Sequence, residues 1–107
     1  MASNCQIPTP QKYVQQMLDY VDYSKKLYGK KVLENSCGEG NILLEVVKRY
    51  IESAKSEKHS AEEIKNGLNK DIEAYEIDKE CIEKCKNRLN KLAASYGIEG
   101  IEWNIKN

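Results

Sequence analysis

Three short apolar runs alternate along the chain with longer segments of helical periodicity, and this alternation constrains the fold most. The runs lie at residues 32–35, 72–77 and 101–105, and the segments around them repeat apolar residues at helical spacing. Such runs favour buried strands, and strands that alternate with helices are joined by right-handed crossovers into a parallel sheet. We therefore expect an α/β fold in which a three-stranded parallel sheet, in the order 3-2-1, is flanked by helices.

The 107 residues are about the length of one domain, in which residues 1–29 and 30–107 have different patterns. In the first part, Thr9 is expected to be the N-cap of a helix with Pro10 at its first helical position. Apolar residues then recur at helical spacing, namely Tyr13, Val14, Met17, Leu18 and Val21. Gly29 is the expected end of this helix. The second part carries the strand–helix–strand–helix–strand pattern.

A polar insert interrupts the second part near residues 52–70, where apolar residues become sparse. Ser60 followed by Glu63 is typical of a capping box, which predicts one short helix after Ser60. We expect this insert to be a surface excursion whose charges form a solvated face.

The composition excludes several classes of function. Lys and Arg number 17, and Asp and Glu also number 17, so the formal net charge is zero. A chain without a basic excess lacks the electrostatic footprint of a nucleic-acid binder that acts alone. No apolar run is long enough to cross a bilayer, and residues 1–6 lack the pattern of a signal peptide. We therefore expect a cytoplasmic protein without membrane contact.

The four cysteines are expected to be free thiols, because nothing in the sequence points to a secreted protein. They are Cys5, Cys37, Cys81 and Cys85, and their spacing does not form the paired knuckles of a zinc site. No metal site is therefore predicted.

The clearest candidate for chemistry is the glycine loop between the first strand and the next helix. Gly38 and Gly40 allow the backbone to turn tightly and to approach a ligand, and the following helix presents free N–H groups. A tight structural turn is the alternative explanation. Glu34 and Glu76 lie at the ends of the first two strands, so we expect both at the carboxyl edge of the sheet. A carboxylate at that edge can accept both hydroxyls of a ribose.

The residues around this loop narrow the choice of ligand. The dinucleotide fingerprint needs a third glycine at the position of Leu43, and Glu34 and Glu39 would repel a pyrophosphate. A ligand with a ribose, no phosphate and a cationic end fits these residues better. S-adenosylmethionine has these properties.

Residues 32–43 resemble motif I of the class I S-adenosylmethionine-dependent methyltransferases, most closely the adenine-N6 DNA methyltransferases of restriction–modification systems. Residues 7–10 resemble the Thr-Pro motif that precedes motif I in that family, and residues 74–78 resemble motif II. Asn35 stands where the family usually has proline. The resemblance covers nearly all of residues 1–107 and implies a fragment of the Rossmann-like methyltransferase fold.

The resemblance also implies cofactor-binding roles for individual residues. Thr9 and Pro10 would cover the methionine end of the cofactor, and Glu34 would lie near its amino group. Glu76 would bind the ribose hydroxyls, and Ile77 would pack on the adenine. The backbone floor and its flanks would consist of Asn35, Ser36, Cys37, Gly38, Gly40 and Asn41.

The catalytic motif of that family, Asn/Asp-Pro-Pro-Tyr/Phe, is absent, because the only prolines are Pro8 and Pro10. We therefore expect this chain to be the cofactor-binding N-terminal portion of a longer enzyme that methylates adenine N6 in DNA. The chain alone is expected to carry no catalytic residue and to be inactive, while other parts of the parent contact DNA.

Three alternatives stay open. The parent could methylate RNA or protein instead of DNA. The chain could be a non-catalytic half-domain that binds a partner, or a second copy of itself, through an exposed strand edge. A dinucleotide-binding oxidoreductase is the third alternative, which the missing glycine weakens.

Overall fold

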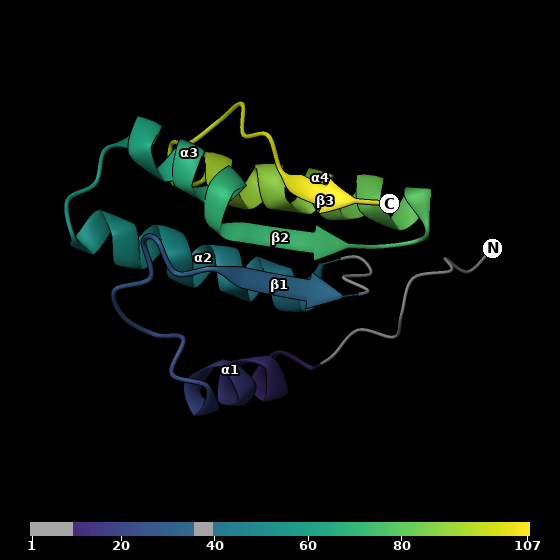
Figure 1. Cartoon of the computed structure of the whole chain (residues 1–107), viewed down its shortest axis with the longest axis horizontal. Helices are drawn as coiled ribbons and strands as arrows, with labels where there is room; N and C mark the ends of the chain where they lie inside the picture. The colour runs from purple at the N-terminus through teal and green to yellow at the C-terminus, as the bar shows by residue number, and fades with distance from the viewer. Residues whose placement is uncertain (1–9, 36–39) are drawn as a thin grey trace.

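The computed structural model describes residues 10–35 and 40–107. Along the chain the elements are α1 (Gln11–Tyr20), β1 (Val32–Asn35), α2 (Asn41–Ser56), α3 (Ala61–Asp71), β2 (Ile72–Tyr75), α4 (Lys79–Ala94) and β3 (Asn104–Lys106) (Figure 1). The described strands form one parallel sheet in the order β1-β2-β3. The predicted α/β class, the parallel pairing and the strand order are therefore confirmed.

The register of the sheet brings the carboxyl ends of the three strands to one edge. Asn35 at the end of β1 pairs with Tyr75 at the end of β2, and Tyr75 pairs with Lys106 at the end of β3. Glu76 and Asn107, which directly follow β2 and β3, therefore lie side by side. This edge is where open parallel sheets bind ligands.

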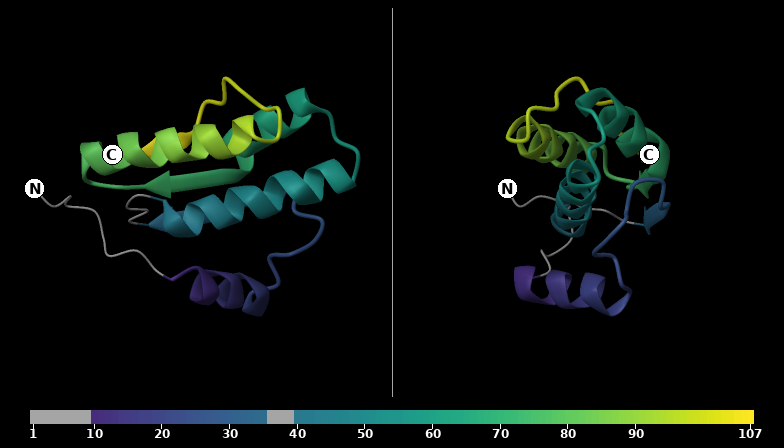
Figure 2. Two further views of the ribbon diagram at one scale, coloured as in Figure 1. Left: turned by 180° about the vertical axis from the view of Figure 1, so that it is seen from behind. Right: turned by 90° about the vertical axis from the view of Figure 1, so that its left-hand side faces the viewer.

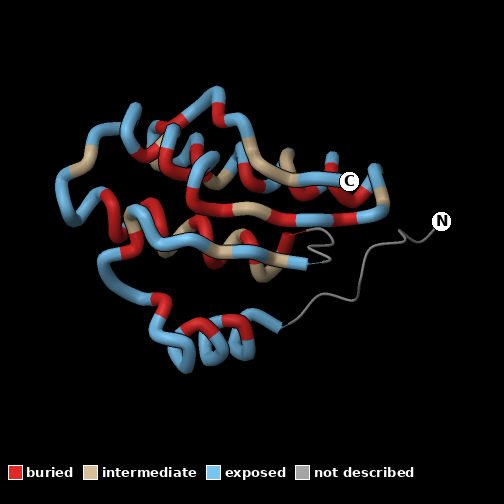
Figure 3. Tube along the Cα trace, viewed as in Figure 1, coloured by how far each residue is buried: buried red, intermediate tan, exposed pale blue. Residues whose placement is uncertain are grey.

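The two faces of the sheet differ. Helices α2 and α4 cover one face, and no helix of the described part covers the other (Figure 2). The buried core includes Ile72 and Ala74 of β2 together with residues of α2 and α4, and Figure 3 colours buried positions red. Strand side chains alternate between faces, so Leu33 and Tyr75 point to the opposite, bare face, where they are 59% and 38% exposed.

The first helix begins one residue later than its sequence pattern predicts. Pro10 is the N-cap of α1 and Gln11 is its first helical residue, whereas Pro10 was expected inside the helix. Pro10 has a φ of −55° and a ψ of 141°, so its backbone is extended rather than helical. The predicted capping role of Thr9 falls outside the described residues.

The same helix also ends earlier than predicted. α1 stops at Tyr20, because Asp22 adopts a left-handed conformation with a φ of 62°. The N–H of Tyr23 then donates to the carbonyl of Leu18 at 2.8 Å, which is a Schellman arrangement. The prediction that the helix continues to Gly29 is therefore wrong, and the segment between α1 and β1 is irregular.

The polar insert packs more closely than predicted. The predicted capping box is confirmed, since Ser60 Oγ accepts from the N–H of Glu63 at 3.1 Å and Glu63 Oε1 accepts from the N–H of Ser60 at 2.8 Å. However, α3 packs against α2 and β2, and its buried residues are Ile64, Gly67, Leu68 and Asp71. The predicted solvated face is confirmed, since Glu62, Glu63 and Lys70 are exposed. The opposite side of the helix is buried, so α3 is part of the packed fold and its interpretation as an excursion from it is wrong.

The cysteines do not all follow the prediction. Cys85 is a buried free thiol, but Cys81 is disulfide-bonded. The prediction of free thiols is wrong for Cys81, because a disulfide depends on proximity in the folded chain, which the sequence spacing does not report.

Candidate functional site

The candidate site is the carboxyl edge of the sheet, where segments far apart in the sequence meet. Glu76 directly follows β2 and Asn107 directly follows β3, and the pairing of Tyr75 with Lys106 places them level with each other. The end of β1 lies at the same end of the sheet (Figure 1). The topology therefore brings the ends of the three strands together, as the sequence predicts.

Gly40 shows why the glycine loop needs its second glycine. It is the N-cap of α2 and has a φ of 92°, a conformation that favours glycine. A Cβ at this position would lie only 2.6 Å from Cys85 Sγ of α4. This close approach is to another helix, so the backbone conformation and the packing against α4 together account for glycine at this position.

Glu34 is a half-buried carboxylate near the end of β1. It pairs in register with Ala74, which is fully buried on the helix-covered face, so the Glu34 side chain points to that face as well. Burial raises the pKa of Glu34 above its ordinary value. A cation bound beside this carboxylate would oppose that shift, because an opposite charge favours the ionised form. Asn35, the next residue, is exposed.

Glu76 is a carboxylate anchored at the end of β2. It is only 8% exposed, and its Oε2 accepts a 3.0 Å hydrogen bond from the N–H of Asp78. Its own N–H donates to the carbonyl of Lys106 at 2.9 Å. Side chain and main chain are therefore both held, and the carboxylate has a defined position at the edge of the sheet.

Ile77, the neighbour of Glu76, is an apolar side chain that is 92% exposed. It precedes Asp78, whose Oδ1 caps α4 by accepting from the N–H groups of Glu80 and Cys81 at 2.9 and 3.2 Å. Asp78 thus stabilises the start of this helix. An exposed isoleucine beside a buried carboxylate offers an apolar surface next to a hydrogen-bond acceptor.

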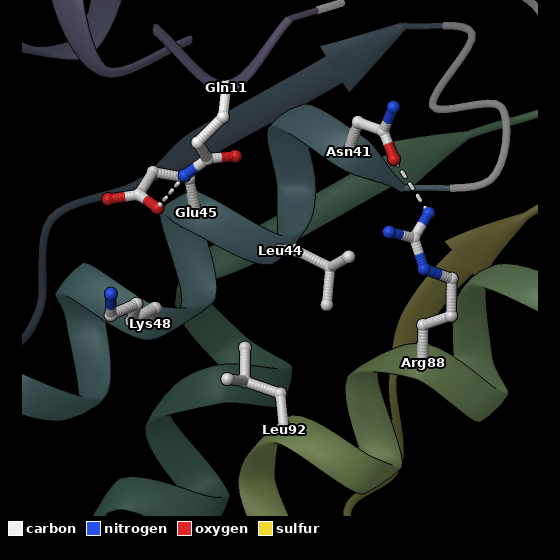
Figure 4. A pocket seen from close by; sticks show the side chains of 7 residues that line it. All are labelled: Gln11, Asn41, Leu44, Glu45, Lys48, Arg88 and Leu92. Atoms are coloured by element: carbon white, nitrogen blue, oxygen red, sulfur yellow. Dashed lines mark hydrogen bonds between the residues drawn. The ribbon is translucent and has the colours of Figure 1, made fainter. Parts of the chain in front are cut away.

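A pocket of about 240 Å³ opens between α1, α2 and α4 (Figure 4). Its lining residues are Gln11, Asn41, Leu44, Glu45, Lys48, Arg88 and Leu92. Arg88 Nη1 donates to Asn41 Oδ1 at 2.6 Å, so the side chain of this predicted site residue is bonded to α4. Neither Glu34 nor Glu76 lines this pocket, which therefore differs from the predicted ribose site.

A polar network that sequence reasoning missed holds α1 against α2. Gln11 Nε2 donates to Glu45 Oε1 at 2.7 Å (Figure 4), and Arg49 Nε donates to Glu45 Oε2 at 3.1 Å. Arg49 also donates to Asp19 Oδ1 at 2.8 Å. Glu45 and Arg49 are four residues apart, a spacing that predicts a helical ion pair. The network fixes the start of α1, next to Pro10, beside the first turns of α2.

Several predicted site residues fall outside the described ranges, namely Thr9, Ser36, Cys37 and Gly38. Their predicted roles stay predictions. Of the others, the structure brings Glu34 and Glu76 to adjacent strand ends. Pro10 is exposed at the start of α1 and contributes to neither strand end.

Two further observations concern the described ranges alone. Within residues 10–35 and 40–107, no three histidine, cysteine or acidic side chains gather in a way that could hold a metal ion. No helix in this part of the chain has both the length and the apolar character needed to span a bilayer.

The sequence matches no protein-family model, and no curated protein matches it significantly. The resemblance to methyltransferases therefore rests on the residues quoted in the sequence analysis alone.

Proposed function

We propose that this chain is the S-adenosylmethionine-binding part of an adenine-N6 DNA methyltransferase of a restriction–modification system. The observation that carries the proposal is Glu76, a buried and anchored carboxylate directly after the second strand of a parallel sheet. A carboxylate there accepts hydrogen bonds from the two hydroxyls of a ribose. The parent enzyme would act in the cytoplasm.

The neighbouring residues fit the rest of such a ligand. Ile77 is exposed beside Glu76, so its side chain is available to pack on an adenine ring. Glu34 lies one residue before the end of the adjacent strand, where a carboxylate attracts an ammonium or sulfonium group. When bound, S-adenosylmethionine supplies an electrophilic methyl group. The residues of this chain bind and orient the cofactor, and the catalytic groups lie in other parts of the parent.

The net charge of the chain agrees with the proposal that it binds the cofactor while other parts of the parent bind DNA. With 17 basic and 17 acidic residues, it has no excess charge with which to bind a polyanion. Arg49 is engaged by acidic side chains of the chain itself. DNA binding is therefore assigned to other parts of the parent.

Calorimetric titration with S-adenosylhomocysteine tests the proposal. The wild-type chain should bind saturably, and Glu76→Gln should weaken binding at least about tenfold, because it removes a charged acceptor of two hydrogen bonds. Glu73→Gln is the matched control, since Glu73 lies on the same strand but pairs with Lys106 at 3.0 Å on the bare face. A folded wild-type chain without saturable binding, or equal losses in both variants, would contradict the proposal.

A second candidate is a non-catalytic half-domain that self-associates. The observation in its favour is Leu33, which is 59% exposed on β1, an edge strand of the described sheet. Edge strands with apolar side chains tend to pair with other chains. Sedimentation should then show a dimer that Leu33→Lys dissociates, without any response to S-adenosylhomocysteine.

A further inference from the structure

Asn107 makes an unusual contact for a residue that follows β3. Its side-chain Nδ2 donates to the carbonyl of Glu76 at 2.9 Å and to the carbonyl of Ile77 at 2.9 Å. These partners lie 31 and 30 residues earlier in the chain. One amide group therefore bridges two consecutive peptide units of the loop between β2 and α4.

The chemistry of this bridge requires a side-chain donor, which the amide of Asn107 supplies. Both partners are main-chain carbonyls, which can only accept hydrogen bonds, so the group that faces them must be the NH₂ and not the oxygen of the side chain. A carboxylate of the same shape has no hydrogen to donate when it is ionised. Aspartate at position 107 would therefore lose both bonds and would place a negative charge against two carbonyl oxygens.

The bridged residues, Glu76 and Ile77, are the two to which the proposed function assigns the ribose and the adenine. Glu76 is also held through its N–H, which donates to the carbonyl of Lys106 at 2.9 Å. Lys106 and Asn107 thus hold the main chain of Glu76 on both sides, and the carboxylate of Glu76 accepts from Asp78. The end of β3 therefore sets the conformation from which Glu76 and Ile77 are presented.

We propose that Asn107 is a positioning residue for ribose and adenine recognition, which it serves by holding the loop at Glu76 and Ile77 in its binding conformation. This inference rests on the proposed function of Glu76 and Ile77. Asn107 needs no contact with the ligand. It acts by removing conformational freedom that binding would otherwise have to remove, and such preorganisation increases affinity.

A double-mutant cycle with S-adenosylhomocysteine tests this role. Asn107→Asp should weaken binding about tenfold, the effect of losing bonds of this type. In the Glu76→Gln background the same change should weaken binding less than about twofold, because residues that act as a unit are not additive. Asn104→Asp in β3 is the matched control and should leave affinity unchanged. Fully additive losses at positions 76 and 107 would overturn the positioning role.

Amide hydrogen exchange measured by NMR tests the bridge without any ligand. Asn107→Asp should speed exchange of the amide protons of Glu76 and Asp78 about tenfold, while that of Leu89 in the core of α4 keeps its wild-type rate. Unchanged exchange at Glu76 and Asp78 would overturn the inference whatever the ligand does. If exchange accelerates but the wild-type chain binds no S-adenosylhomocysteine, the proposed function fails and the bridge stands.

Discussion

The hydroxyl of Tyr50 donates a 2.6 Å hydrogen bond to Asp71 Oδ2 and so joins α2 to the end of α3 inside the core. The same oxygen accepts from the N–H of Gly29 at 2.7 Å. One carboxylate therefore holds two helices and the turn before β1. Burial, with the hydrogen bond to Asp71, raises the pKa of Tyr50, so the hydroxyl keeps its proton and stays a donor.

We predict that Tyr50→Phe lowers the free energy of unfolding by about 1–3 kcal/mol, because it leaves a buried carboxylate without one of its donors. Urea denaturation measures this change. Lys31→Ala is the comparison, since Lys31 Nζ lies 3.6 Å from Asp71 Oδ1 but its side chain is 66% exposed. Lys31→Ala should lower the free energy of unfolding by less than about 1 kcal/mol. A larger loss in Lys31→Ala than in Tyr50→Phe would contradict this account.

Replacing Tyr23 by phenylalanine should stabilise the fold, whereas the same replacement at Tyr50 should destabilise it. Its side chain is 4% exposed, and within the described ranges its hydroxyl has no hydrogen-bond partner. Burial, with the nearby charge of Asp71, raises the pKa of Tyr23. Tyr23→Phe removes a desolvated polar group and should raise the free energy of unfolding by about 1 kcal/mol. A lower melting temperature for this variant would show that the hydroxyl is satisfied in solution.

Two glycines with similar backbones should differ in their tolerance of alanine. Gly29 and Gly40 have φ values of 88° and 92°, so alanine is strained at both, by about 1–2 kcal/mol. At Gly29 a Cβ meets nothing within 4 Å, whereas at Gly40 it meets Cys85 Sγ. Gly40→Ala should therefore be the more destabilising change in thermal unfolding, by at least about 1 kcal/mol. Equal losses would mean that α4 moves aside freely.

The pH dependence of stability should report the burial of Glu34. Because its pKa is raised in the folded state, the folded chain holds this proton more tightly than the unfolded chain. Stability should then fall as pH rises from the ordinary carboxyl pKa of about 4.5 through the raised pKa, and the loss is complete above it. Glu34→Gln should remove this slope and make the chain more stable at neutral pH.

Glu73→Gln is the control of opposite sign for that experiment. The hydrogen bond from Lys106 lowers the pKa of Glu73, so this carboxylate stabilises the fold above the ordinary carboxyl range and loses that contribution in acid. Urea midpoints across the range from acid to neutral pH measure both variants. A Glu34→Gln variant whose midpoints follow the wild type at every pH would contradict the assigned cause.

The architecture followed from the sequence because its signals are local. Apolar runs, capping residues and glycines report on their own segments, and the rules of parallel sheets then set the strand order. The errors arose from one local exception and one distant contact. Asp22 ends α1 in a conformation that glycine usually adopts. Leu68 is buried because the largely polar α3 packs against α2 and β2.

Some features of the candidate site could likewise be predicted from the sequence, and others could not. The placement of Glu34 and Glu76 near adjacent strand ends could be predicted, because topology alone determines it. The close approach of Gly40 to Cys85 and the reach of Asn107 to the preceding loop could not. Both contacts depend on how α4 and β3 pack in the fold. A glycine or an asparagine in the sequence does not indicate such packing.

The bare face of the sheet carries paired charged side chains as well as apolar ones. Glu73 accepts from Tyr75 at 2.8 Å and pairs with Lys106, whose Nζ lies 5.8 Å from the centre of the Tyr75 ring. Water therefore covers most of this surface, and Leu33 is the exposed apolar side chain most able to contact another molecule. A sheet face of this kind is less prone to non-specific association than an apolar one, so partly folded chains that expose it should aggregate less readily.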